Sequence, residues 1–380
     1  RLLSVTIVII LLFSFFANTI LADTGAAKAI PEVYVGIDAA YGDVGKIKEL
    51  VNNVSSYTNL FVIGCRAITS NTSSLDEACQ YLYDKGLYFI IFQEDALGRV
   101  PFFSVVPSDW TKSAKTRWGD HFLGFYYMDE LGGKQIDQSS WSSLKTGKDY
   151  QDITNQYVAR VKYYLDWFKG GYSDWTDVSL FTSDYALYWY DYKGGYDTVL
   201  AEYAWNNSRQ LNTALCRGAA SAQNKEWGAM VTWTYTTQPY IESGDELYKD
   251  MVYAYNNGAK YIVVFDSNKE YTQGILTEEH LNALKQFWNY IQQNPRENNH
   301  SEKRSAIVLP QYYGYSFRRP EEKVWGLWDA GNSSYTLCAG INTLLEQYGT
   351  KLDIIYDDGS QSGSASKYSN LFYWNNSKEF

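Results

Sequence analysis

Residues 73–93 read SSLDEACQYLYDKGLYFIIFQ, and this stretch joins two different patterns at one glycine. Before Gly86, apolar residues recur at helical spacing, and glycine is a typical residue at the end of a helix. After it, residues 87–93 form a short apolar run, as expected of a strand that is buried on both faces. The stretch therefore predicts a helix followed by a buried strand.

The same alternation recurs along most of the chain. Seven more strand-like apolar runs lie at 33–38, 60–64, 122–128, 178–182, 198–203, 228–235 and 260–265. Further helical stretches start at Val44 and cover 150–168, 206–224, 245–256 and 277–293. Strand–helix alternation predicts parallel strands with right-handed crossovers, and eight such strands favour a closed barrel. Residues 184–195 lack a helical pattern, so we expect a loop insertion there.

These patterns predict an α/β fold with two parts. We expect a (βα)8 TIM barrel over residues 31–294, a polar linker over 295–305 and a small α/β domain over 306–380. In the last part, strand-like runs at 306–310, from 352 and from 371 surround a helix candidate at 338–348. We expect this domain to be cut short soon after its third strand.

The first 22 residues carry one charge ahead of a long apolar run, RLLSVTIVIILLFSFFANTILA. This pattern predicts either a signal peptide that is cleaved after Ala22 or an uncleaved anchor that tethers the chain to a membrane. Both alternatives place the remaining chain outside the cell or at its surface. Six Asn-x-Ser/Thr sequons agree with export and predict a glycoprotein: Asn53, Asn71, Asn206, Asn299, Asn332 and Asn375.

Cysteine usage and composition narrow the function class. In an oxidising compartment we expect disulfides, with Cys65–Cys79 and Cys216–Cys338 as one of three pairings. No spacing typical of a metal site occurs, and we expect neither metal nor cofactor.

A net charge of −10 argues against nucleic acid as a partner. The 35 Tyr and 13 Trp suit a cleft that binds sugars, although they also fit an aromatic core.

Acidic residues stand at the predicted ends of several strands, where barrel active sites lie. Cleavage of a glycosidic bond uses two carboxyl groups, one of them protonated. We predict Glu130, which follows an aromatic run, as the general acid, with Asp129 tuning it and Glu202 as the partner carboxylate. The predicted substrate-binding residues are Asp38, Tyr126, Asp184, Trp205, Trp233, Tyr235 and Asp266.

The segment FLGFYYMDELGG at 122–133 resembles the fourth-strand segment of several barrel glycosidase families, in which an acid pair ends an aromatic strand. In the glycosidase families whose segment is most similar, the acid pair is followed by Pro, whereas Leu131 occupies that position here. The C-terminal segment resembles the small flavodoxin-like domain that follows the barrel in some β-galactosidases, which implies a homo-oligomer. In two-glutamate barrels the second acid ends strand seven, and strand seven here has none.

The sequence therefore predicts a secreted glycosidase, a hydrolase that cleaves O-glycosidic bonds of a poly- or oligosaccharide. The alternative is a non-catalytic carbohydrate-binding or cell-surface structural protein on the same barrel, since one fold hosts many functions. The missing acid on strand seven favours that alternative.

Overall fold

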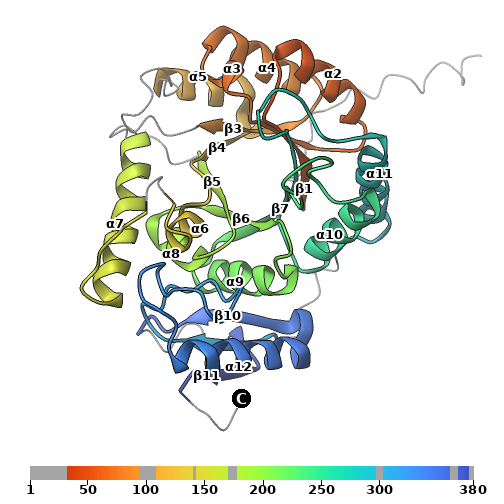
Figure 1. Cartoon of the computed structure of the whole chain (residues 1–380). Coiled ribbons are helices and arrows are strands. Elements are labelled where there is room, and N and C mark those ends of the chain that lie inside the picture. The colour runs from red at the N-terminus through yellow and green to blue at the C-terminus, as the bar shows by residue number, and fades with distance from the viewer. Residues whose placement is uncertain are drawn as a thin grey trace, which may run out of the picture. The chain divides into compact units, whose positions relative to one another are not determined.

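The fold is described from a computed structural model, which covers residues 32–93, 108–139, 143–169, 178–296, 303–359 and 367–375. Eight parallel strands close into a barrel in sequence order, and β1 pairs with β8 (Figure 1). The strands are β1 Tyr34–Ala39, β2 Leu60–Ile63, β3 Tyr88–Gln93, β4 Phe122–Tyr127, β5 Ser179–Asp184, β6 Thr198–Tyr203, β7 Glu226–Val231 and β8 Tyr261–Asp266. All eight predicted strands and the barrel are confirmed.

Helices surround the barrel (Figure 1). They are α2 Val44–Val54, α3 Arg66–Thr69, α4 Thr72–Asp84, α5 Ser108–Trp118, α6 Leu131–Ile136, α7 Tyr150–Phe168, α8 Tyr188–Gly194, α9 Arg209–Ala222, α10 Gly244–Asn256 and α11 Glu278–Gln293, with a 3-10 turn at Gly119–His121. The loop insertion expected at 184–195 is wrong, because α8 occupies most of it. Helix α8 lies between α7 and α9, so Tyr188, Trp189, Tyr190 and Tyr192 are all buried and no amphipathic stripe marks the helix.

The interior of the barrel is filled by side chains that alternate along the strands. The rings of Tyr34, Tyr88 and Tyr261, each the first residue of its strand, pack together at the amino end, with Tyr34 and Tyr261 stacked at 5.0 Å. Above them lie further interior residues, including Leu60, Val62, Ile90, Phe181, Leu200, Met230 and Val263. Because this plug closes the amino end, the carboxyl ends of the strands are the place for a site.

A three-stranded parallel sheet follows the barrel, in the order β10-β9-β11. Its strands are β9 Ser305–Leu309, β10 Leu352–Tyr356 and β11 Asn370–Tyr373, and its helix is α12 Asn332–Tyr348, which begins earlier than the predicted 338. The sheet packs on α9, where Arg217 Nε donates to Asp353 Oδ1 at 2.6 Å and both side chains are buried. A Cβ on Gly218 of α9 would overlap the carbonyl of Ile354, so this glycine permits the close approach of helix and strand.

All four cysteines are buried and free, so the predicted disulfides are wrong. Two of the thiols donate a hydrogen bond to a backbone carbonyl instead. Cys65 Sγ donates to Gly42 O at 2.9 Å, and Cys216 Sγ donates to Val199 O at 3.5 Å. Cys79 lies on the buried face of α4, and Cys338 lies on α12. Their helices direct these thiols into separate parts of the core.

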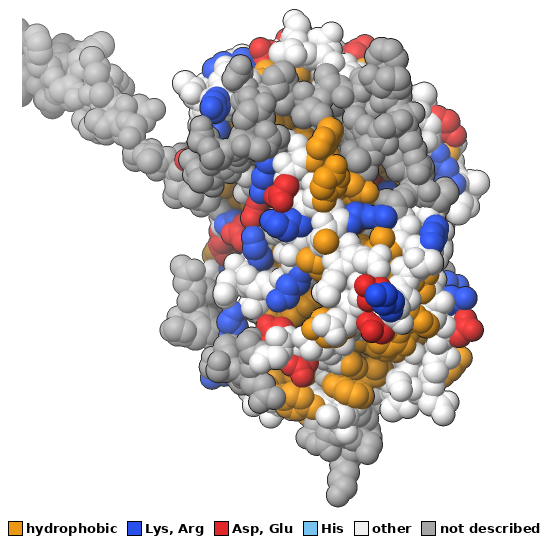
Figure 2. All heavy atoms as spheres, turned by 90° about the vertical axis from the view of Figure 1, so that its left-hand side faces the viewer, with side chains coloured by type: hydrophobic (Ala, Val, Ile, Leu, Met, Phe, Trp, Pro, Cys, Tyr) orange, Lys and Arg blue, Asp and Glu red, His pale blue; other side chains and the backbone are white. Residues whose placement is uncertain are grey.

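Residues 1–22, which are predicted to be a signal peptide or anchor, lie outside the described residues, as do the sequon at Asn299 and most of the predicted linker at 295–305. No helix of the described part of the chain is long and apolar enough to span a membrane. Figure 2 shows one face of the molecule, on which basic and acidic side chains are interspersed with scattered hydrophobic groups.

Candidate active site

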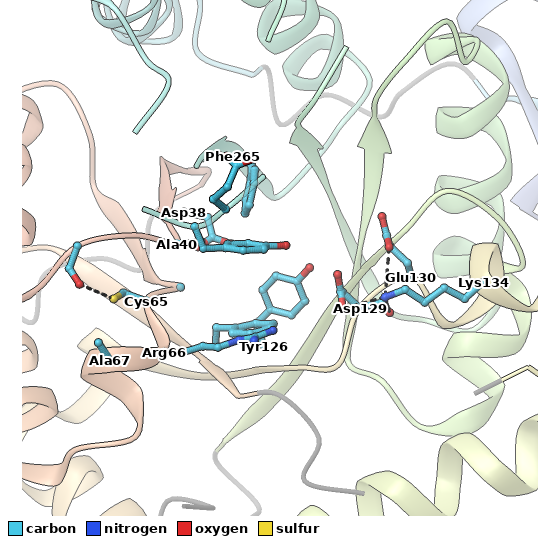
Figure 3. A pocket seen from close by; sticks show the side chains of 15 residues that line it. Asp38, Ala40, Cys65, Arg66, Ala67, Tyr126, Asp129, Glu130, Lys134 and Phe265 are labelled. Atoms are coloured by element: carbon cyan, nitrogen blue, oxygen red, sulfur yellow. Dashed lines mark hydrogen bonds and ion pairs between the residues drawn. The ribbon is translucent and has the colours of Figure 1, made fainter. Parts of the chain in front are cut away.

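A cavity of about 400 Å³ lies at the carboxyl ends of the barrel strands. Figure 3 shows its labelled residues, which come from β1, β4, β8, α3, α6 and the adjoining turns. Its charged residues are Asp38, Arg66, Asp129, Glu130, Lys134 and Glu270, and its large aromatic residues are Phe92, Tyr126, Phe265 and Tyr271. The cavity therefore brings together three of the predicted acids and one of the predicted sugar-binding tyrosines.

Asp129 and Glu130 both line the cavity, although strict alternation along a strand would send them to opposite faces. The strand ends at Tyr127, and the chain then turns sharply, with φ of 58° at Met128 and 53° at Glu130. These left-handed values are uncommon outside glycine. Glu130 N donates to Ser183 O at 2.8 Å, which ties the turn to β5. The turn therefore brings both acids into one cavity.

The Gly132-Gly133 pair after these acids is explained by Asp184, the last residue of β5. Asp184 accepts backbone hydrogen bonds from Gly132 N at 2.5 Å and Gly133 N at 2.8 Å, and two more from Tyr185 N and Ala186 N. A Cβ on Gly132 would overlap the carbonyl of Ala186, and one on Gly133 would overlap the ring of Tyr185. Asp184 is fully buried, so it positions the turn and α6 instead of contacting a ligand as predicted.

Lys134 holds the acid pair from α6. Its Nζ lies 3.3 Å from Asp129 Oδ1 and 3.2 Å from Glu130 Oε2 (Figure 3). Burial, followed by the negative charge of Asp129, raises the pKa of Glu130 to about 7, while Lys134 acts in the opposite direction. Glu130 therefore changes charge near neutral pH, as a general acid should.

Asp38 reaches the cavity from β1. Its side chain is 2% exposed, and its Oδ1 has no hydrogen-bond partner among the described residues. A Cβ on Gly64 would overlap this oxygen, so the carboxyl group fits only because residue 64 is glycine. Burial, followed by the charges of Asp129 and Asp266, raises the pKa of Asp38 well above its usual value. In its protonated form this carboxyl group has both a donor and an acceptor.

Tyr126 leads from the cavity to a buried carboxyl group. Its hydroxyl lies 2.7 Å from Ser183 Oγ, and Ser183 Oγ lies 2.6 Å from Glu202 Oε1. Glu202 is 4% exposed and is not among the residues that line the cavity. Burial, followed by the charge of Glu130, raises the pKa of Glu202 well above its usual value. This placement does not support the predicted role of Glu202 as the partner carboxylate at the bond.

The sequence matches no protein-family profile and no curated protein. Solved structures with the same architecture exist. A variant of a GH5_18 protein from Streptomyces cattleya, in complex with Manβ1-4GlcNAc, has a TM-score of 0.54 at 10% identity, over 90% of this chain and 99% of that one. A β-galactosidase from Halorubrum lacusprofundi has a TM-score of 0.54 at 9% identity, over 90% of this chain and 69% of that one.

A GH5_18 variant from Bifidobacterium longum gives a TM-score of 0.52 at 10% identity and also covers 90% of this chain. The fold is that of the barrel glycoside hydrolases.

Two other predicted residues support the rim of the barrel. Asp266 accepts from Ile275 N at 2.6 Å, Leu276 N at 3.0 Å and the Tyr41 hydroxyl at 3.0 Å, so its carboxylate fixes the loop after β8. Trp233 donates from Nε1 to Ser267 O at 2.7 Å. Both residues brace the walls of the site and are not among the residues that line the cavity.

Trp205 and Tyr235 are exposed large hydrophobic side chains of the barrel, at 38% and 48%. Both follow strand ends, and Trp205 N donates to Trp233 O at 3.0 Å, so their turns adjoin. Neither is among the residues that line the cavity. Their predicted role as sugar platforms stays a prediction.

Sequence reasoning missed several cavity residues, among them Lys134, Arg66 and Tyr271. Lys134 stands four positions after Glu130 at the start of α6, and the i,i+4 spacing of opposite charges was the signal for it. Arg66 is the first residue of α3 and Tyr271 lies in the loop after β8, and the guanidinium is 5.7 Å from the ring centre. Nothing in the local sequence marks that contact. Glu94 and Asp95, noted as acids at the end of strand three, lie outside the described residues.

Proposed function

We propose that the protein is an exported glycoside hydrolase that cleaves an O-glycosidic bond of an oligo- or polysaccharide in the cavity around Glu130. The observation that carries the proposal is the cavity in which the acid pair Asp129 and Glu130, held by Lys134, lies beside several aromatic rings, with burial and Asp129 raising the pKa of Glu130 to about 7. A proton donor of that pKa suits the protonation of a leaving-group oxygen at neutral pH.

The neighbouring groups take distinct roles in this proposal. Glu130 gives its proton to the leaving oxygen. Asp129, whose carboxylate is held by Lys134, stabilises the positive charge that develops on the sugar ring or activates water. Asp38, which lines the cavity, exchanges hydrogen bonds with sugar hydroxyls. Tyr271 and Phe265 offer apolar ring faces to sugar C–H groups.

Support for carbohydrate as the substrate class also comes from the structural neighbours. One GH5_18 variant is complexed with Manβ1-4GlcNAc and a second GH5_18 structure with GlcNAc, and the other neighbours include a β-galactosidase and an α-L-fucosidase. A first substrate panel therefore contains mannosyl, N-acetylglucosaminyl, galactosyl and fucosyl glycosides, each as an aryl glycoside and as an oligosaccharide.

The test compares the wild-type protein with Glu130→Gln on this panel. The matched control is Glu226→Gln, because Glu226 is an exposed glutamate at the amino end of the barrel. We expect cleavage of at least one glycoside, a loss of about a hundredfold or more in Glu130→Gln and no change in the control. Sugar binding without any cleavage would instead support the carbohydrate-binding alternative, and cleavage that survives in Glu130→Gln would discard the assigned acid.

A further inference from the structure

A buried hydrogen-bond chain leads from the cavity across three adjacent strands. It joins Tyr126 on β4, Ser183 on β5 and Glu202 on β6, through contacts of 2.7 Å and 2.6 Å. All three side chains are buried, and Phe181 and Leu200 occupy the preceding interior positions of β5 and β6. Of the three, Tyr126 lines the cavity, so its phenol is the end of the chain that a ligand meets.

The direction of the hydrogen bonds in this chain depends on whether Glu202 is protonated and on which of its oxygens carries the proton. A serine and a tyrosine hydroxyl each have one proton to donate, and an ionised carboxylate only accepts. When Glu202 is ionised, Ser183 donates to it and Tyr126 donates to Ser183, so the phenol presents only lone pairs to the cavity. When Glu202 is protonated on Oε1, the oxygen that faces Ser183, it donates to Ser183, Ser183 donates to Tyr126, and the phenol proton is free to enter the cavity. When the proton lies on Oε2 instead, Oε1 still accepts from Ser183.

The surroundings of Glu202 favour the protonated state. The groups whose charges interact with Glu202 are Glu130 and Asp129 in the turn after β4, Asp184 on β5 and Tyr188 in α8. On β7 its partner is the apolar Met230. Burial and the carboxylates favour the neutral acid, whereas the hydrogen bond from Ser183 favours the ionised form.

We propose that Glu202 is a positioning residue that acts through Ser183 to make the Tyr126 hydroxyl a hydrogen-bond donor toward an acceptor oxygen of the bound sugar. The sugar as ligand rests on the proposed function, whereas the chain of hydrogen bonds does not. A single proton on Glu202 thus selects between two arrangements of the cavity, one that donates from Tyr126 and one that only accepts there.

The first test needs no ligand. Carbon-13 at Cζ of tyrosine reports whether the phenol donates or accepts a hydrogen bond, and Tyr126→Phe assigns the resonance. In the wild-type protein we expect the Tyr126 signal to move with pH, at the same midpoint as the side-chain carboxyl carbon of Glu202. That movement should be absent in Glu202→Gln, because glutamine has nearly the same shape as glutamate but does not titrate. It should also be absent in Ser183→Ala, because this substitution removes the hydroxyl that links Tyr126 to Glu202.

The outcomes of this test are unambiguous. A Tyr126 signal that stays fixed from pH 4 to 9, or one that titrates equally in Glu202→Gln and Ser183→Ala, overturns the proposal. The two variants change different strands, so Ser183→Ala still decides the question if Glu202→Gln does not fold, which far-ultraviolet circular dichroism would show.

The second test measures binding of the oligosaccharide panel to Glu130→Gln, which allows titration without turnover. We expect affinity to fall about tenfold as pH rises through the midpoint of Glu202, the size of one lost hydrogen bond. Adding Glu202→Gln should make the affinity independent of pH in that range. Binding that stays equally pH-dependent in the double variant overturns the positioning role. If no sugar binds but Tyr126 titrates as expected, the proposed function fails while the hydrogen-bond chain stands.

Discussion

The backbone amide of Gly132 donates a hydrogen bond to the carboxylate of Asp184 at 2.5 Å, and this contact fixes the turn that carries Glu130. Three further amides, of Gly133, Tyr185 and Ala186, reach the same carboxylate. The four donors stabilise a buried negative charge that has no basic partner among these contacts. The candidate acid therefore depends on a residue that is fully buried behind the cavity wall.

Asp184→Asn tests this anchor. The amide nitrogen of asparagine would face a backbone N–H, so we expect the free energy of unfolding to fall by about 2–4 kcal/mol. Urea denaturation measures the change. Asp149→Asn is the control, because Asp149 caps α7 with one amide hydrogen bond and asparagine caps helices equally well, so its effect should stay below about 0.5 kcal/mol. Equal effects of the two substitutions would show that Asp184 is not a special anchor.

The acid pair makes a prediction about pH. Glu130 must be protonated to act, so kcat/KM should fall as pH rises through about 7. Lys134→Met removes a charge that lowers the pKa of Glu130, and the midpoint should move to higher pH. Asp129→Asn removes a charge that raises this pKa, and the midpoint should move to lower pH. Shifts in the same direction for both variants would contradict the assignment of Glu130.

The raised pKa of Glu130 also has a consequence for stability. Because the folded-state pKa lies above the ordinary value of 4.5, Glu130 contributes stability that is complete below about pH 4.5 and is lost as pH rises through about 7. Glu130→Gln should therefore make unfolding free energy less dependent on pH between 4.5 and 7. Urea titrations at several pH values measure the slope, and an unchanged slope would argue that Glu130 titrates normally.

The buried pair between Arg217 and Asp353 joins the small sheet to the barrel. Arg217→Met leaves Asp353 buried without its closest cation, so we expect a loss of about 3–5 kcal/mol in unfolding free energy. Lys249→Met is the control, because its pair with Glu246 is well exposed and surface pairs contribute little. A loss in Arg217→Met no larger than in the control would mean that solvent reaches this interface.

The cysteines give a direct chemical prediction. Ellman's reagent should find four thiols after denaturation without reductant, and few in the native protein, because all four are free and buried. Burial raises the pKa of Cys79 and Cys216 well above the usual value, which keeps them unreactive. A count of zero or two in the denatured protein would restore the disulfide prediction.

Local patterns in the sequence were sufficient for the barrel. Each strand is a separate apolar run in the sequence. Helix α7 was predicted at its observed residues because its apolar residues recur at helical spacing along one face. Helix α8 was missed because aromatic residues cover all its sides, and periodicity disappears when a helix is buried all round.

The site was harder to predict, because side-chain direction there departs from strand geometry. Asp129 and Glu130 enter one cavity together because left-handed residues end β4, and no residue type at those positions signals such a turn. Asp184 and Glu202 are buried acids behind the cavity wall, and whether a buried acid faces a ligand or its own backbone depends on contacts between strands. The Gly132-Gly133 pair was the one local sign of the Asp184 anchor.

The measurement that tests the central claim most directly is the dependence of cleavage on the leaving group. Glu130→Gln and the wild-type protein are compared on an unactivated oligosaccharide and on a 2,4-dinitrophenyl glycoside of the same sugar, whose leaving group needs no proton. A general acid at Glu130 predicts a loss of about a hundredfold or more on the oligosaccharide and only a small loss on the activated glycoside. Equal losses on both substrates, or none on either, would contradict Glu130 as the proton donor.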